Sequence, residues 1–427
     1  MTALWTPDPA RIARTRITEF MHRLEAAGHG PFEGDYGTLH RWSVEQPGLF
    51  WGALWDYGGV VGEGERQPVL ESPEMFPGAR WFPGVRLNFA ENLLRRRDQH
   101  PALVSLLENG ERRQTSYAEL YVKVAQLAAS LRADGVVAGD RVAGFLPNIE
   151  ETVVAMLAAT SIGALWSSCS PDFGISGVMD RFGQIAPKVL FAADGYHYNG
   201  KRCDSLARVR EIAARIDSLE KVVVVPLLTA EPDLAGIDHA VAFPEYLDAS
   251  ATDIAFERLP FDHPLYIMYS SGTTGVPKCI VHGAGGSLLQ HLKEHQLHTD
   301  LGPDDVLFYF TTCGWMMWNW LVSALASGAA VLLYDGHPLQ PETALWDFVA
   351  EEGAEVFGTS ARHLAACRKA GLEPGRTHDL ERLRAVLSTG SPLDPESFAW
   401  VYRDVKTDLQ LSSISGGTDI VSCFALG

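Results

Sequence analysis

The sequence lacks the features of a membrane-spanning or secreted protein. No uninterrupted apolar run reaches the ~18 residues that a membrane span requires. The first residues, MTALWTPDPARIARTR, lack the apolar core of a signal peptide. The six cysteines (169, 203, 279, 313, 367 and 423) stand far apart and form no CxxC pair, which favours reduced, packed thiols. These absences together predict a cytoplasmic protein.

Basic residues are also in short supply. The chain has 35 Lys and Arg against 53 Asp and Glu, a formal net charge of −18. Because an acidic surface repels polyanions, nucleic acid and anionic membranes are not expected as principal partners. Small anions must then be bound by local clusters of basic side chains and N–H groups. With 427 residues, 46% hydrophobic and 21% charged, the chain is long enough for two or more cores.

From Pro101 onward, short apolar runs alternate regularly with amphipathic segments. The runs are ALVSLL, RVAGFL, ALWSSC, KVLFAA and KVVVV, and then VLFYF, AVLLY, EVFGT, AVLST and LQLSS. Helices are expected between them at 116–133, 149–162, 203–216, 286–298, 317–326, 342–352 and 360–370. Apolar strands separated by amphipathic helices predict an α/β fold of parallel sheets with helices on both faces.

Composition divides the chain into three parts. Residues 1–98 carry tryptophans at 5, 42, 51, 55 and 81 and many Gly and Pro breaks, with helices expected at 11–27 and 47–57. Most of this part is expected to be a helical cap packed through its aromatic side chains. Periodicity fades again between Pro226 and Pro264. We therefore predict an N-terminal extension (1–98) and two α/β subdomains (99–245 and 246–427), the second containing the anion-binding loop described next.

A buried strand followed by a loop suited to anions runs from Tyr266 to Gly286. Pro277 fixes φ just before Lys278, whose ammonium group adds a positive charge. Although the spacing is not that of a Walker A motif, several short donors and one cation suit a triphosphate. The alternative is a surface turn between a strand and a helix. The loop residues supply hydroxyl and backbone N–H groups that can surround an anion: Ser270, Ser271, Gly272, Thr273, Thr274 and Gly275.

SSGTTGVPKCIVHG resembles the phosphate loop of the adenylate-forming superfamily of acyl-CoA synthetases, luciferases and peptide-synthetase adenylation domains. HRWSVEQPGLFWGALWDY and WFPGVRLNFAENLL are similar to the N-terminal extension of its acetyl-CoA synthetase branch. The resemblance implies two helix-flanked, mostly parallel sheets, those of the family's N-terminal domain. It also implies that the loop and a catalytic Lys278 bind the β and γ phosphates of ATP while a carboxylate attacks the α phosphate.

In open α/β sheets, ligands bind beyond the carboxyl ends of the strands. The segment TTCGWMMWNW follows VLFYF, and the resemblance implies that Trp315, Met316 and Met317 line the pocket for the acyl group. For Trp318 and Trp320, burial in the core is an equally good interpretation.

The segment GSPLD follows AVLST, and STGSPLD (388–394) occupies the place of the family's Gly-Glu-Pro adenine segment. The resemblance implies that Gly390, Ser391 and Pro392 lie against the adenine, although Ser391 replaces the usual glutamate. A strand-to-helix turn with Asp394 as the N-cap is the alternative, and capping and binding can coexist.

SGGTDI, residues 415–420, resembles the family's Tyr-Gly-x-Thr-Glu motif. The resemblance implies a catalytic Thr418 that bonds the α phosphate and an Asp419 that takes the glutamate's role at Mg²⁺, directly or through water. Acetyl-CoA synthetases have a tryptophan two positions before this threonine, where this chain has Gly416. The resulting room implies a larger acid, acetoacetate, in a pocket also lined by Thr389. Butyrate fits such a pocket as well.

The remaining expectations concern CoA and the whole reaction. ADGYHYNGKRCD follows KVLFAA where relatives bind CoA phosphates, so Lys201 and Arg202 are candidates, with a solvated pair opening a helix as the alternative. His282 is expected to be packed or to line the substrate site. The resemblance implies an AMP-forming acyl-CoA ligase that uses ATP, Mg²⁺, acetoacetate and CoA.

Two other functions remain as alternatives. One is a ligase for propionate or butyrate, and the other is a non-catalytic nucleotide-binding module. Because the chain ends eight residues after Asp419, where relatives continue into a C-terminal lid domain, we expect a front portion that does not complete catalysis alone.

Overall fold

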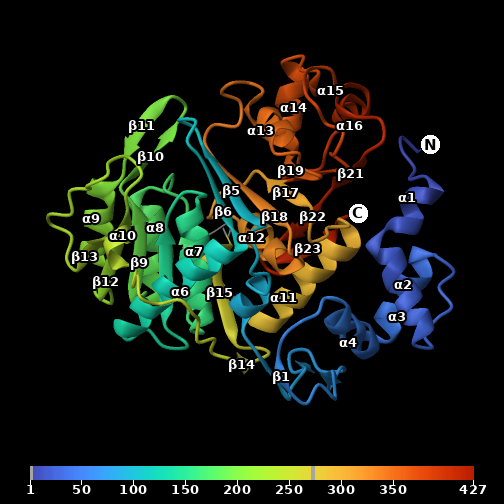
Figure 1. The fold of residues 1–427 in the computed structure, drawn as a ribbon, viewed down its shortest axis with the longest axis horizontal. Coiled ribbons are helices and arrows are strands. Elements are labelled where there is room, and N and C mark those ends of the chain that lie inside the picture. Colours follow the sequence, from blue (N-terminus) through green and yellow to red (C-terminus); the bar gives the residue numbers. More distant parts are fainter. Residues whose placement is uncertain (1–2, 271–274) are drawn as a thin grey trace.

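Two seven-stranded sheets organise the molecule, seen in a computed structural model that describes residues 3–270 and 275–427 (Figure 1). The first sheet has the order β13-β12-β9-β7-β8-β15-β16, and all its neighbours are parallel except the β15–β16 pair. Its strands are β7 (Arg141–Phe145), β8 (Leu165–Cys169), β9 (Val189–Ala193), β12 (Lys221–Val225), β13 (Ala240–Ala242), β15 (Pro264–Ser270) and β16 (Lys278–Gly283).

The second sheet has the order β21-β20-β19-β17-β18-β5-β6 and is parallel except for the β5–β6 pair. The predicted α/β class with two mostly parallel sheets is therefore confirmed. The strands are β5 (Pro101–Leu107), β6 (Arg112–Ser116), β17 (Val306–Tyr309), β18 (Ala330–Asp335), β19 (Val356–Ser360), β20 (Ala385–Thr389) and β21 (Gln410–Ser413).

The two sheets exchange strands across the expected boundary at residue 245. β5 and β6, cyan in Figure 1, join the later strands β17 to β21, whereas β15 and β16 complete the earlier sheet. The prediction that the loop after Ser270 belongs with the second group of strands is therefore wrong. Composition along the chain cannot reveal this exchange because it arises from pairing between distant segments.

Alternating side chains of each strand enter different cores. In β12, Val223 and Val225 face the largest core, which lies between the sheets, while Val222 and Val224 face the outer core under α8 and α9. Helices of the first half are α5 (Phe89–Leu93), α6 (Tyr117–Ala133), α7 (Glu150–Ser161), α8 (Ile175–Ile185), α9 (Leu206–Arg215) and α10 (Phe243–Tyr246).

The second sheet is covered in the same way, with α11 and α12 contributing to the core between the sheets and α13, α14 and α16 to the outer core. Among the described residues, no helix has the length and apolarity needed to cross a membrane. The helices are α11 (Ala284–Lys293), the π-helix η1 (Glu294–His298), α12 (Met316–Ser323), the 3₁₀-helix η2 (Ala324–Ser327), α13 (Ala344–Glu351), α14 (Ala361–Lys369), α15 (Pro374–Thr377), α16 (Pro395–Trp400) and the π-helix η3 (Val401–Val405).

Most predicted helices are present, and local capping explains their limits. The helix expected at 116–133 begins after Ser116, whose side chain and that of Glu119 form a reciprocal capping box. The helix expected at 11–27 is instead two helices, because Thr15 is extended and caps the second one.

The N-terminal part is a helical cap with its own aromatic core, as expected. Its helices are α1 (Pro9–Arg14), α2 (Arg16–Ala26), α3 (Tyr36–Glu45) and α4 (Pro47–Tyr57). Small strand groups follow: β1 (Glu63–Gly64) with β4 (Val85–Leu87) and β14 (Leu259–Pro260), and β2 (Leu70–Glu71) with β3 (Arg80–Trp81).

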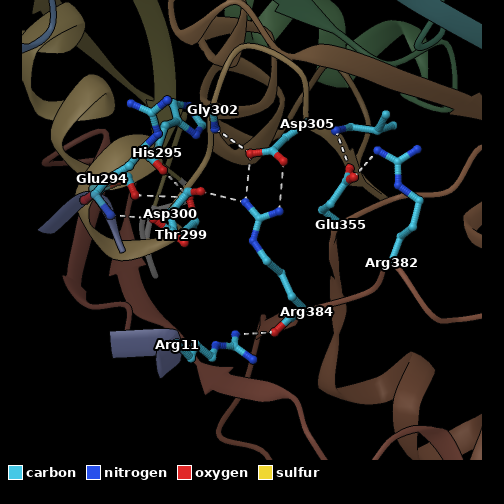
Figure 2. A network of polar contacts seen from close by, with 12 residues as sticks. Arg11, Glu294, His295, Thr299, Asp300, Gly302, Asp305, Glu355, Arg382 and Arg384 are labelled. Atoms are coloured by element: carbon cyan, nitrogen blue, oxygen red, sulfur yellow. Dashed lines mark hydrogen bonds and ion pairs between the residues drawn. The ribbon is translucent and has the colours of Figure 1, made fainter. Parts of the chain in front are cut away.

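Figure 2 shows how the cap is fastened to the amino-terminal edge of the second sheet. Just before β20, the guanidinium of Arg384 makes a bidentate pair with Asp305 (2.9 and 2.8 Å) and donates to the carbonyl oxygen of Asp300 (2.6 Å). The carbonyl oxygen of Arg384 accepts a hydrogen bond from Arg11 of α1 (2.9 Å). This network stabilises the amino-terminal ends of the strands. The carboxyl ends lie at the opposite edge of the sheet, where ligands bind in open α/β sheets.

Candidate active site

The predicted phosphate loop joins two antiparallel strands. Ser270, the last residue of β15, pairs with Lys278, the first residue of β16. Gly275 has a φ of +97° and open space at its Cβ position, which suits a tight loop. The amide of Gln184 holds the carbonyl oxygen of Pro277 at 2.9 Å. The alternative of a strand-to-helix turn is therefore wrong. Four residues of the predicted site lie outside the described residues: Ser271, Gly272, Thr273 and Thr274.

β16 connects this loop with the SGGTDI segment. Lys278 and His282 are four residues apart and so lie on the same face of the strand, about 13 Å apart at ~3.3 Å per residue. His282 Nε2 lies 2.7 Å from the carbonyl oxygen of Thr418. Since a carbonyl only accepts, Nε2 carries the proton and donates it. Burial lowers the pKa of His282, which keeps the imidazole neutral at pH 7.

Behind Thr418, the chain is held by a buried carboxylate. Glu294 of η1 is 1% exposed and accepts hydrogen bonds from the Ser422 hydroxyl, the Cys423 backbone N–H (3.1 Å) and the Trp320 indole N–H (2.8 Å). His291 Nε2 of α11 lies 2.6 Å from the carbonyl oxygen of Val421. Sequence reasoning missed Glu294, because the segment around it, HLKEHQLH, is rich in polar residues and does not mark this carboxylate as buried.

The carboxyl ends of β20 and β17 lie close together in the second sheet. The Tyr309 hydroxyl of β17 donates to Thr389 Oγ1 of β20 (3.2 Å). The predicted adenine residues Gly390, Ser391 and Pro392 follow directly and are exposed. Asp394 caps α16 through the Ser397 backbone N–H (2.9 Å), so the capping interpretation is confirmed, while adenine contact stays a prediction.

The three residues expected to line the acyl pocket after β17 have different environments. Trp315 is the N-cap residue of α12 and is 68% exposed, whereas Met316 and Met317 are buried in the core between the sheets. Trp318 and Trp320 are completely buried, in agreement with the core interpretation.

Gly416 does not open a space for a longer acyl group in this structure. It lies in β22 (Ser415–Gly417), paired with β23 (Ser422–Ala425). A Cβ at Gly416 would lie 2.2 Å from the Ser422 carbonyl oxygen and 2.7 Å from the Cys423 Cα. The expectation of free volume is therefore wrong, because the backbone of β23 fills the position that a side chain would take.

The candidate CoA residues Lys201 and Arg202 lie in a β-hairpin. β10 (Gly195–Tyr198) pairs with β11 (Lys201–Asp204), and the helix begins only at Leu206, so the interpretation of a pair opening a helix is wrong. The Glu108 carboxylate accepts hydrogen bonds from the Asn199 and Gly200 backbone N–H groups (2.9 and 2.6 Å). The hairpin tip is thus fixed, with two exposed cations beside it.

Asp419 is exposed and belongs to no ready-made metal cluster. Within residues 3–270 and 275–427, no three His, Cys, Asp or Glu side chains are grouped so that they could hold a metal ion. A single carboxylate nonetheless fits Mg²⁺, which commonly takes one or two carboxylates and completes its shell with phosphate oxygens and water. The donor set therefore suits magnesium that arrives with a nucleotide.

A cavity of about 440 Å³ adjoins the His282–Thr418 contact. The face of α11 that carries Ser287 and Gln290 lines it, together with residues 420–423. Trp51, Trp81 and Phe82 of the N-terminal part also line it. Sequence reasoning missed this cavity because segments from three parts of the chain form it. None of the five predicted acyl-pocket residues lines it: Trp315, Met316, Met317, Thr389 and Gly416.

Comparisons with known proteins find relatives along the whole chain. The chain is 51% identical over 429 residues to an acetoacetyl-coenzyme A synthetase of Rhizobium meliloti (strain 1021), covering 99% of this chain and 65% of the relative. It is 41% identical over 421 residues to a malonamoyl-CoA synthetase of Penicillium aethiopicum, covering 92% of this chain and 58% of that relative. The chain thus spans less than two thirds of the length of these relatives.

A solved structure, an acetoacetyl-CoA synthetase from Streptomyces lividans, matches with a TM-score of 0.95 at 46% identity and covers 100% of this chain and 66% of that chain. Residues 36–93 match the acetyl-coenzyme A synthetase N-terminus. Residues 89–425 match the AMP-binding enzyme family. This range contains both seven-stranded sheets and the His282–Thr418 contact. The chain therefore belongs to the AMP-binding enzyme family.

Proposed function

We propose that this chain binds ATP and acetoacetate and takes part in the AMP-forming synthesis of acetoacetyl-CoA. The observation that carries the proposal is the hydrogen bond between His282 and Thr418. It links the strand that begins at Lys278 to the segment proposed to meet the α phosphate. A nucleotide laid along this face of β16 would have its outer phosphates near Lys278 and its α phosphate nearer Thr418.

In the proposed first step, a carboxylate oxygen of acetoacetate attacks the α phosphorus of ATP, and pyrophosphate leaves. Lys278 and the loop N–H and hydroxyl groups stabilise negative charge on the departing phosphates. Thr418 holds the α phosphate, and Asp419 would hold Mg²⁺ together with phosphate oxygens, where the ion would offset the charge of the triphosphate. Gly390, Ser391 and Pro392 would contact the adenine.

In the second step, the CoA thiolate attacks the acyl carbonyl carbon, and AMP leaves. Lys201 and Arg202 are proposed to bind CoA phosphates, because both are exposed cations on a fixed hairpin of an otherwise acidic protein. Burial of His282 lowers its pKa, so it is proposed to position Thr418 and not to transfer a proton.

The acid class is proposed from the relatives. Acetoacetyl and malonamoyl groups both carry a carbonyl at C3 of the acid, one as a ketone and the other as an amide. The shared chemistry is a short carboxylate with a hydrogen-bond acceptor at C3. This favours acetoacetate over propionate and butyrate, and two ligases among the similar proteins favour an enzyme over a non-catalytic binding module.

Binding of MgATP measured by isothermal titration calorimetry tests the nucleotide site. We expect Lys278→Ala to weaken binding at least about tenfold, because a charge-assisted contact to phosphate is lost. Lys369→Ala, an exposed lysine at the end of α14, is the matched control. Equal affinities for the two variants and the native protein would contradict the proposal.

Exchange of labelled pyrophosphate into ATP tests the adenylation step on the same protein. Any residual exchange that this chain supports should be faster with acetoacetate than with butyrate at equal concentration. Faster exchange with butyrate would contradict the proposed acid.

A further inference from the structure

The turn that carries Thr418 and Asp419 closes on a strained residue. Residues 418–421 connect β22 to β23, and the Val421 backbone N–H donates to the carbonyl oxygen of Thr418 (3.2 Å). Val421 has a φ of +46°. This left-handed conformation is easy for glycine but costly for a residue that is branched at Cβ. Such a backbone persists only where the surrounding structure holds it, and it is often found at functional sites.

Two histidines hold the two ends of this turn. His282 of β16 donates to the carbonyl oxygen of Thr418 (2.7 Å). His291 Nε2 of α11 lies 2.6 Å from the carbonyl oxygen of Val421, and since a carbonyl only accepts, this nitrogen donates the bond. We call these two contacts the histidine clamp.

The ring of His291 is itself fixed on both sides. His291 is completely buried, and burial lowers its pKa, so the imidazole is neutral at pH 7. With the proton on Nε2, Nδ1 accepts a hydrogen bond from the Ser323 hydroxyl of α12 (2.7 Å). The donor that reaches Val421 is therefore held in one orientation by a neighbouring helix.

Burial of the Val421 side chain also holds the turn. This side chain is 4% exposed and belongs to the core between the sheets. Packing fixes the side chain, whereas the bond from His291 fixes the carbonyl oxygen, so substitutions can separate the two contributions. On the other side of the turn, Asp419 is exposed. The turn is thus anchored toward the interior and open where a ligand can reach it.

We propose that His291 is a positioning residue of the candidate active site, which keeps the turn strained and so holds Thr418 and Asp419 where a triphosphate and its Mg²⁺ bind. This inference rests on the proposed function. His291 touches no substrate and acts only through the turn. Without the histidine clamp, Val421 would relax toward an ordinary negative φ, and the direction of the chain between Thr418 and β23 would change.

Calorimetric binding of MgATP and of adenosine tests whether His291 acts on phosphate binding. Adenosine keeps the base proposed to contact residues 390–392 but has no phosphate. We expect His291→Leu to weaken MgATP binding about tenfold and adenosine binding by less than about twofold. His291→Gln keeps an N–H donor and should restore most of the MgATP affinity. His363→Leu, which replaces another buried histidine in α14, is the matched control.

A double-mutant cycle tests the role of the strain. Glycine accepts a positive φ without being held, so the loss of His291 should matter less once Val421 is replaced by glycine. We expect His291→Leu to weaken MgATP binding about tenfold in the native background and less than about threefold in the Val421→Gly background. Equal losses in the two backgrounds would overturn the proposal, because His291 would then act independently of the strained residue.

The outcomes separate this inference from the proposed function. Absence of MgATP binding to the native protein would overturn the nucleotide site and the inference with it. Normal binding to the native protein, with MgATP and adenosine weakened alike by His291→Leu, would overturn the inference alone. Should His291→Leu fail to fold, Ser323→Ala removes the donor to Nδ1 and should weaken MgATP binding about threefold. Unchanged MgATP affinity of Ser323→Ala would equally overturn the inference.

Discussion

The imidazole of His282 and the carbonyl oxygen of Thr418 are 2.7 Å apart and join β16 of the first sheet to the chain that follows the second. His282→Ala removes this donor, and we expect it to weaken MgATP binding about tenfold because Thr418 is no longer held in place. His263→Ala is the control, since His263 makes a similar bond, but to the Gly163 carbonyl (2.8 Å) and not to Thr418. MgATP affinity is measured by calorimetry. Equal affinities of His282→Ala and His263→Ala for MgATP would contradict the prediction.

Replacing Glu294 should destabilise the protein strongly. Glu294→Ala leaves the Trp320, Ser422 and Cys423 donors buried without an acceptor, which should cost about 3–5 kcal/mol. Glu294→Gln keeps one carbonyl oxygen as an acceptor and should cost less. Urea unfolding measures both, and Glu396→Ala is the control at an exposed carboxylate, with an expected change under about 1 kcal/mol. A loss for Glu294→Ala no larger than the control would show that the network contributes little.

Acid should destabilise the fold through buried histidines, and His363 is the clearest case. It is 4% exposed, and burial lowers its pKa to about 4, below the ~6.5 of an unfolded chain. As pH falls below 6.5, the unfolded state binds a proton that the folded state does not, so stability is lost between pH 6.5 and 4.

For His363 alone this linkage amounts to about 2 kcal/mol between pH 7 and pH 5. His363→Leu cannot be protonated, so its free energy of unfolding should fall by about 2 kcal/mol less than that of the native protein over this interval. Urea unfolding of both proteins at the two pH values gives this difference directly. An equal change in the free energy of unfolding for the native protein and His363→Leu would contradict the lowered pKa of His363.

Adjacent glycines of β22 should respond very differently to alanine. Gly416→Ala places a Cβ 2.2 Å from the Ser422 carbonyl oxygen, whereas a Cβ at Gly417 meets nothing within 4 Å. We expect Gly416→Ala to displace β23 and cost about 1–3 kcal/mol, and Gly417→Ala to cost far less. Thermal unfolding of the two variants checks this, and equal melting temperatures would mean that β23 moves aside freely.

Local sequence patterns predicted most strands and helices because their signals are local. The helix at 47–57 and the ten apolar strands are present where expected. β6 was missed because its sequence, RRQTS, belongs to a polar edge strand with little hydrophobic periodicity. The break at Thr15 was also missed, since the apolar pattern continues through both helices.

For the candidate site, too, the sequence indicated the residues that stand in local motifs and not those that packing brings together. Motifs at the ends of strands singled out Lys278, Thr389 and Thr418, and the roles of these residues stay predictions. Glu294 and the cavity lined by Trp51 and Trp81 could not be found in this way. Their importance comes from packing between α11, the N-terminal part and residues 420–423, which no single segment encodes.

The exchange of strands between the sheets has a consequence for synthesis on the ribosome. The β5–β6 pair is complete at Ser116, yet its only neighbour among the strands that the structure describes, β18, begins at Ala330. Until then one edge of β5 has no partner, so the growing chain must keep an apolar strand from pairing with other chains. This sheet therefore cannot close until Ala330 and the rest of β18 have been synthesised.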